Sequence, residues 1–100
     1  MKRSATAVER AHMAKVAALG CQLCIFLEYG ATPAEIHHCR TKHGWGRSNH
    51  MDTIGLCPEH HRGQPGGIHD FGRQEFEEHY GISEMQLLDV VKQKTESATD

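Results

Sequence analysis

The segment that decides the fold runs from residue 53 to residue 61 and reads TIGLCPEHH. Its first four residues favour a short β-strand, because Thr and Ile are good strand formers. Proline is tolerated in the first turn of a helix, so a helix carrying His60 and His61 is expected to begin around Cys57. Glycines and a proline within 63–67 predict that this helix is very short.

A second short strand is expected upstream, where residues 35–39 read EIHHC. The two strands would pair as an antiparallel hairpin, joined by a loop over residues 40–50. Helical spacing returns in residues 70–80, where Phe76 and Tyr80 stand four apart. These elements predict a small α+β domain in which helices flank a hairpin.

The two ends of the chain are also expected to be helical. Ser4 is a candidate cap for a helix that runs to Leu19 and ends at Gly20. Its apolar face is expected to comprise Val8, Ala11, His12, Val16 and Leu19. Ser83 and Gln86 have the spacing of a capping box for a last helix, with a frayed tail after Lys94. That helix is expected to bury Met85, Leu88 and Val91.

Two ligand pairs stand about thirty positions apart, each with two intervening residues: Cys21 with Cys24, and Cys57 with His60. Two residues between ligands let a tight turn, such as the one expected at 21–24, aim both side chains at one ion. Two such turns complete a tetrahedron of three thiolates and one imidazole, the donor set of a structural zinc site. An alternative ligand set replaces His60 with Cys39. Ordinary buried cysteines are a further alternative.

Composition sets limits on the kind of protein. One hundred residues suit one domain with a modest core, which a bound metal ion would reinforce. No signal peptide and no membrane span are recognisable, so we expect a cytoplasmic protein with reduced thiols. The net charge of −2 hides an asymmetry, because the chain is basic up to His69 and acidic from Asp70 onward.

Seven of the nine histidines lie between residues 37 and 69. His37 and His38 are adjacent on a predicted strand, so their side chains should point to opposite faces and do different work. If one binds a divalent metal ion, the other is available as a general base. His61 follows a predicted zinc ligand, and His69 is placed to close a metal site from a loop.

With EIHH at 35–38, TIGLCPEHH at 53–61 and GIH at 67–69, the chain resembles the HNH (His-Me finger) nucleases of the phage Ref type, the RecA-dependent recombination nucleases. The resemblance implies a ββα-metal core in which His37 binds the catalytic metal and His38 is the base. His61 would be a second ligand. The middle position of the motif would be filled by Asp52 or His50.

The resemblance also predicts organisation and partners. The N-terminal helix would span 1–20, the zinc-knuckle nuclease core 21–81, and the C-terminal helix and tail 82–100. Pro65 occupies the position one turn beyond His61, so the remaining metal ligand is assigned to His69. The family implies a Mg²⁺ or Mn²⁺ cofactor beside the structural Zn²⁺, DNA as substrate, RecA filaments as a partner, and a phage or prophage origin in a bacterial host.

The loop at 40–50 predicts how DNA would be held. Arg40, Lys42 and Arg47 alternate with glycines and Trp45, a pattern suited to phosphate contacts without base reading. Two other interpretations remain open. The chain could be a non-catalytic zinc module that binds nucleic acid or protein, or its hydrolytic site could act on RNA or branched structures.

Overall fold

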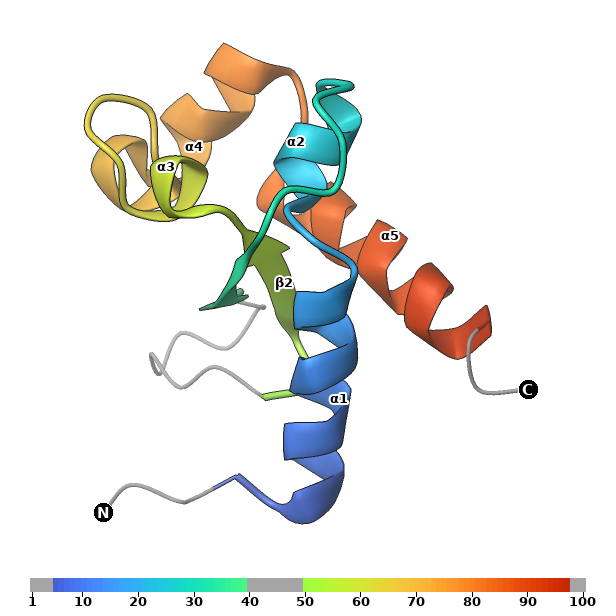
Figure 1. Cartoon of the computed structure of the whole chain (residues 1–100). Coiled ribbons are helices and arrows are strands. Elements are labelled where there is room, and N and C mark those ends of the chain that lie inside the picture. The colour runs from blue at the N-terminus through green and yellow to red at the C-terminus, as the bar shows by residue number, and fades with distance from the viewer. Residues whose placement is uncertain (1–4, 40–49, 98–100) are drawn as a thin grey trace.

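The computed structural model describes residues 5–39 and 50–97 (Figure 1). The elements in chain order are α1 (Ala7–Ala18), α2 (Gln22–Phe26), β1 (Glu35–His38), β2 (Thr53–Leu56), α3 (Pro58–His61), α4 (Ile68–Tyr80) and α5 (Glu84–Ser97). The predicted α+β class is confirmed. None of the helices in the described part is long and apolar enough to span a membrane.

Strands β1 and β2 form the predicted antiparallel hairpin. In its register Glu35 lies opposite Leu56, and His37 lies opposite Ile54. Because side chains alternate along a strand, Glu35 and His37 share one face of the sheet and His38 projects from the other. The predicted division between the two histidines therefore follows directly from the hairpin.

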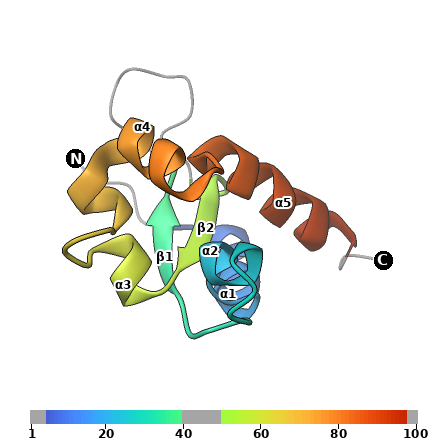
Figure 2. The ribbon, with the colours of Figure 1, turned by 90° about the horizontal axis from the view of Figure 1, so that it is seen from above.

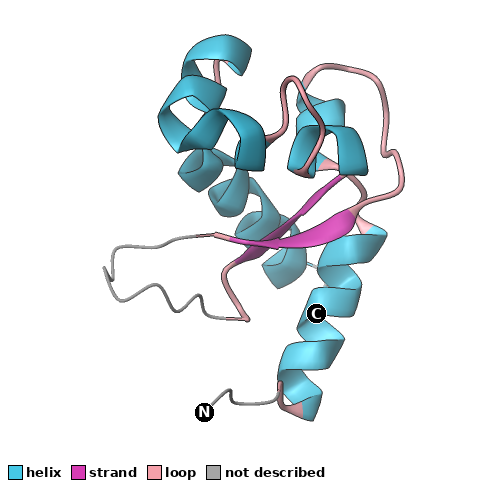
Figure 3. Ribbon diagram, turned by 90° about the vertical axis from the view of Figure 1, so that its left-hand side faces the viewer, coloured by secondary structure: helices cyan, strands magenta, loops and turns pink. Residues whose placement is uncertain are grey.

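Helices cover the hairpin from both sides (Figure 2). In this view α3 and the first part of α4 lie on one side of the hairpin, α1 and α2 lie on the other, and α5 runs outward from beside β2 toward the C-terminus. Figure 3 shows the two strands between these groups of helices. All four residues of β2 are buried, so this strand is the centre of the packing.

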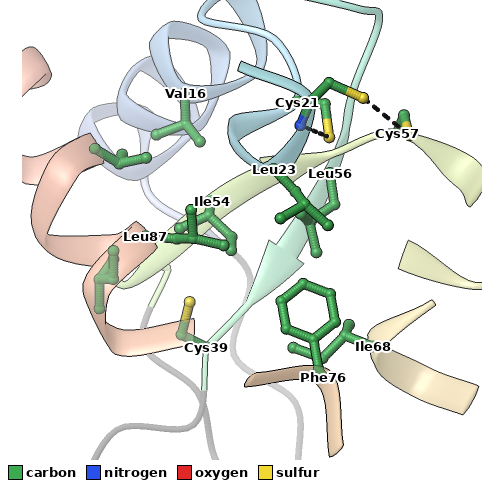
Figure 4. Packing of buried hydrophobic residues seen from close by; sticks show 13 residues of the cluster. Val16, Cys21, Leu23, Cys39, Ile54, Leu56, Cys57, Ile68, Phe76 and Leu87 are labelled. Carbon is green, nitrogen blue, oxygen red and sulfur yellow. Dashed lines mark hydrogen bonds between the residues drawn. The ribbon is translucent and has the colours of Figure 1, made fainter. Parts of the chain in front are cut away.

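The core gathers side chains from every part of the described chain (Figure 4). Fully buried apolar residues come from both terminal helices, from α2, from β2 and from α4: Val16, Leu23, Ile54, Leu56, Phe76, Leu87 and Val91. Three of the four cysteine thiols lie at one end of this cluster, and Cys39 lies apart from them.

A close approach between Gly20 and Gly55 seats α1 against β2. A Cβ atom at Gly55 would stand 2.7 Å from the carbonyl oxygen of Gly20. Gly20 itself has a φ of +85°, the left-handed conformation in which glycine ends a helix without strain. Both positions therefore require glycine, and the predicted stop at Gly20 is confirmed.

Two details of α1 differ from expectation. The helix begins at Ala7 with Thr6 as its cap, in a capping box with Glu9, and not at a Ser4 cap. The Thr6 hydroxyl accepts a hydrogen bond from the Glu9 amide, and the Glu9 carboxylate accepts one from the Thr6 amide. Val8 is 71% exposed, so the predicted apolar face is buried at Val16 and not along its whole length.

The other corrections concern α2 and α5. Cys21 caps a five-residue helix where a tight turn was predicted. The Ser83–Gln86 capping box is confirmed by two reciprocal hydrogen bonds, but α5 continues past Lys94 to Ser97. Met85 is 37% exposed and does not belong to the buried stripe of α5. That stripe follows the i, i+3, i+4, i+7 pattern and consists of Glu84, Leu87, Leu88 and Val91.

We predict that Leu87→Ala lowers the free energy of unfolding by about 2–5 kcal/mol, because it leaves a cavity in the core. Met85→Ala, on the same helix, should change it by no more than about 0.5 kcal/mol. Urea unfolding of the two variants and the wild type, followed by circular dichroism, measures both changes. Equal losses in the two variants would contradict the helix register.

Candidate metal centres

Cys21, Cys24, Cys57 and His60 form one compact group, which we call the sulfur cluster. Their ligand atoms lie within 4.8 Å of one another. The Sγ atoms of Cys24 and Cys57 are 3.8 Å apart, and His60 Nδ1 lies 3.3 Å from Cys57 Sγ. A tetrahedral zinc ion with bonds of about 2.3 Å to sulfur and 2.0 Å to nitrogen separates its ligands by about 3.5–3.8 Å. The cluster therefore fits a zinc ion closely.

Local structure explains how the sulfur cluster forms. Cys21 precedes α2 and accepts a hydrogen bond from the amide of Cys24, one turn later (Figure 4). Cys57 likewise precedes α3, whose single turn brings His60 back beside it. Burial is the main cause that raises the pKa of Cys24 to about 12. A bound cation would be needed to hold this thiol as the thiolate.

The structure brings His60, and not Cys39, to the three cysteines. Cys39 lies across the core from Cys21 and Cys57 (Figure 4). It is fully buried, and burial followed by the charge of Glu84 raises its pKa. Its neighbours at ligand distance are His37 and Glu84. The alternative zinc set with Cys39 does not match this arrangement.

A second group, the imidazole cluster, consists of His37, His61 and His69. Their ring centroids are 4.7–5.3 Å apart. The Nε2 atoms of His61 and His69 stand 3.0 Å from each other. Two nitrogens bound to one cation at about 2.1 Å would be separated by about 3.0–3.4 Å, so these rings are spaced for shared metal ligation. His69 is exposed, which leaves the cluster open to a substrate.

Burial lowers the pKa of His69, followed in effect by the neighbouring His61 and His37. The lowered pKa favours the neutral ring, which is the form that binds a metal ion. His69 is the second residue of α4 and does not lie in a loop, where it was expected; the loop before α4 turns the chain back so that α4 starts beside α3 (Figure 2). Positions 61 and 69 therefore meet although Pro65 interrupts the helical path between them.

Glu35 is a member of the site that the sequence analysis missed. Its Oε1 accepts a hydrogen bond from His61 Nδ1 at 2.8 Å, which leaves Nε2 of His61 free to face His69. Arg62 also donates to this carboxylate. Arg62 and then His61 lower the pKa of Glu35, so the carboxylate is ionised. Its position two residues before His37, on the same face of a strand, was the available signal.

On the opposite face of β1, His38 lies beside His50. The His38 Nε2 and His50 Nδ1 atoms are 2.9 Å apart, a hydrogen-bond distance. Burial, followed by the charges of His50 and His37, lowers the pKa of His38 and keeps the ring neutral near pH 7. A neutral imidazole held by a neighbour is suited to accept a proton.

Asp52 is engaged elsewhere. Its Oδ1 pairs with Lys92 Nζ at 2.9 Å, and its carbonyl oxygen accepts a hydrogen bond from the amide of Cys39. Of the two candidates for the middle position, His50 is the one whose side chain reaches His38. Arg40, Lys42, Arg47 and Trp45 of the predicted DNA-binding loop lie outside the described residues.

Residues 5–96 match the model of a family described as recombination enhancement, RecA-dependent nuclease. The chain belongs to this family. The match extends beyond the region that carried the resemblance in the sequence, into α1 and α5, and it confirms the interpretation as a nuclease of recombination. Among curated proteins, no sequence matches the chain. In this nuclease, both clusters and the pair of His38 and His50 lie within the matched residues.

We predict that the purified nuclease retains one tightly held zinc ion, and that Cys57→Ala loses it and unfolds. Cys39→Ala should keep the zinc, because Cys39 stands outside the sulfur cluster. Metal analysis after dialysis against a mild chelator measures the stoichiometry. Loss of zinc in Cys39→Ala with retention in Cys57→Ala would reverse the assignment.

Proposed function

We propose that this nuclease is an HNH-type endonuclease that hydrolyses phosphodiester bonds of DNA with the help of Mg²⁺ or Mn²⁺. A zinc ion in the sulfur cluster would be structural, since four protein ligands leave no open position. The single observation that carries the proposal is the division of His37 and His38 between two sites on opposite faces of β1.

The imidazole cluster supplies the binding site for the divalent ion: His37, His61 and His69. When bound, such an ion neutralises charge on the phosphate and stabilises the leaving oxygen. Glu35 orients His61 by accepting the hydrogen of Nδ1. The carboxylate also offsets part of the positive charge that a cation adds to the site.

His38 is assigned as the general base. In the tautomer in which His38 Nε2–H donates to His50 Nδ1, the lone pair on His38 Nδ1 is left to accept a proton from water. His50 then limits rotation of the ring and supports the positive charge that develops on it. A further hydrogen bond holds the backbone of His50, because the Thr53 hydroxyl donates to the His50 carbonyl oxygen at 3.2 Å.

The main alternative is a zinc module without catalysis, whose histidines would all serve the zinc ion. Among the described residues, His60 is the histidine that lies with Cys21, Cys24 and Cys57. The imidazole cluster is a separate group. A purely structural protein has no need for three converging histidines with an exposed member. This arrangement favours the enzyme.

The description of the family supports a partner and a substrate. We propose that the nuclease acts on DNA held by a RecA filament, and that RecA supplies the targeting. Arg40, Lys42 and Arg47 are proposed to contact the phosphate backbone. A loop that contacts phosphates brings affinity without sequence selection, so targeting by a partner would be required.

We expect His38→Ala to lower the rate of DNA nicking by about 10²–10⁴-fold, because it removes the general base. The nicking assay uses supercoiled and duplex DNA as substrates. Each is tested with Mg²⁺ or Mn²⁺, with and without RecA filaments. His79→Ala, an exposed histidine outside both clusters, is the control and should retain full activity.

Undiminished nicking in purified His38→Ala would disprove the assignment of the base. No nicking by the wild type under any of these conditions would favour the zinc module. Cleavage of RNA or branched DNA in preference to duplex DNA would redirect the substrate proposal.

We also expect His50→Ala to reduce the nicking rate by at least about 10-fold, since fixing a catalytic imidazole is worth up to about 10⁴-fold. Asp52→Asn should have a smaller effect, because the Asp52 carboxylate pairs with Lys92 and not with His38. Single-turnover rates at saturating metal compare the two. A larger loss in Asp52→Asn would make the aspartate the orienting residue instead.

A further inference from the structure

Glu84 is a buried carboxylate whose surroundings the proposed function has not used. It is the first residue of α5 and only 3% exposed. Its Oε2 accepts a hydrogen bond from His37 Nε2 at 2.7 Å. Its Oε1 is buried and has no hydrogen-bond partner among the described residues. A buried carboxylate is costly unless its charge is compensated, so this placement requires an explanation.

Helix formation alone does not account for the burial of Glu84. An acidic residue in the first turn of a helix is favoured by the helix dipole, but it gains this benefit at the surface too, without the cost of burial. Here the capping box of Ser83 and Gln86 fixes the start of α5, and the buried Leu87 and Leu88 hold the helix against the core. The fold thereby drives the carboxylate inward, onto His37.

We propose that Glu84 is a positioning residue for the divalent-metal site: it accepts the Nε2 hydrogen of His37 and so presents Nδ1 of His37 to the cation. The inference rests on the proposed function, because it assumes a divalent cation at the imidazole cluster. Hydrogen bonding at one ring nitrogen decides which nitrogen is left to bind a metal.

The geometry favours this role over direct ligation by Glu84. A separation of 2.7 Å between His37 Nε2 and Glu84 Oε2 is that of a charge-assisted hydrogen bond, shorter than the distance between two ligands of one cation. In addition, Glu84 groups at ligand distance with His37 and Cys39, whereas His37 groups separately with His61 and His69. His37 therefore belongs to both groups, whereas Glu84 is not grouped with His61 or His69.

Glu35 and Glu84 form a matched pair behind two of the three histidines. Glu35 accepts a hydrogen bond from His61, as Glu84 does from His37. The Glu35 side chain is 31% exposed and shares its charge with Arg62, whereas the Glu84 side chain is 4% exposed. Glu84 should consequently have the stronger influence on metal affinity, because less solvent screens its charge.

The test measures Mn²⁺ binding directly, by the loss of the electron paramagnetic resonance signal of free Mn²⁺, in zinc-loaded protein without DNA. Glu84→Gln keeps an acceptor but removes the charge, and we expect about 10-fold weaker binding. Glu84→Leu removes both, and we expect up to about 100-fold weaker binding. Glu75→Gln makes the same chemical change at an exposed position of α4 and should bind Mn²⁺ like the wild type.

Zinc content and circular dichroism accompany each titration, so that a folding defect is recognised. A purely structural role for Glu84 predicts a change in stability with Mn²⁺ affinity unchanged in folded protein. Wild-type Mn²⁺ affinity in folded Glu84→Gln would overturn the proposal, whether or not Glu84→Leu folds.

Failure of the proposed function has a different signature. It would appear as no Mn²⁺ binding by the wild type, or as binding that survives His37→Ala. A different result would concern Glu84 alone. If the wild type binds Mn²⁺, His37→Ala does not bind it, and Glu84→Gln has wild-type Mn²⁺ affinity, only the proposed role of Glu84 is wrong.

Discussion

The pairing register of β1 and β2 is the constraint on which the whole site depends. With His37 opposite Ile54, His37 lies with His61 and His69 and His38 lies beside His50. A slip of β1 by one residue against β2 would exchange the two histidines between the faces. The burial of β2 on both faces resists such a slip, so the same packing that stabilises the domain sets the faces on which the two imidazoles lie.

The short helix α3 links the two centres. His60 belongs to the sulfur cluster and the next residue, His61, belongs to the imidazole cluster. A metal ion that holds Cys57 and His60 would thus also fix the origin of His61, although it takes no part in the chemistry. The domain has a small core, and such a coupling would explain how a helix of one turn can hold His61 in place.

Carboxylates behind the histidines form a second layer of organisation. Glu35 comes from the hairpin and Glu84 from the last helix, so two segments far apart in the sequence support the site. The match to the family model runs through residue 96 and so includes nearly all of α5. The burial of Glu84 would be explained if its partner, His37, binds a cation, because the cation would compensate the buried charge.

Much of this could be read from the sequence, because the deciding signals are local. Ligand spacing predicted the four members of the sulfur cluster, and alternation separated His37 from His38. Both strands and the short helix α3 follow from residues 35–39 and 53–61. Contacts between distant segments were decided only by the tertiary structure: His50 and not Asp52 at His38, and Glu84 at His37. Spacing along the chain reports neighbours on one element, whereas these pairs depend on how separate elements pack.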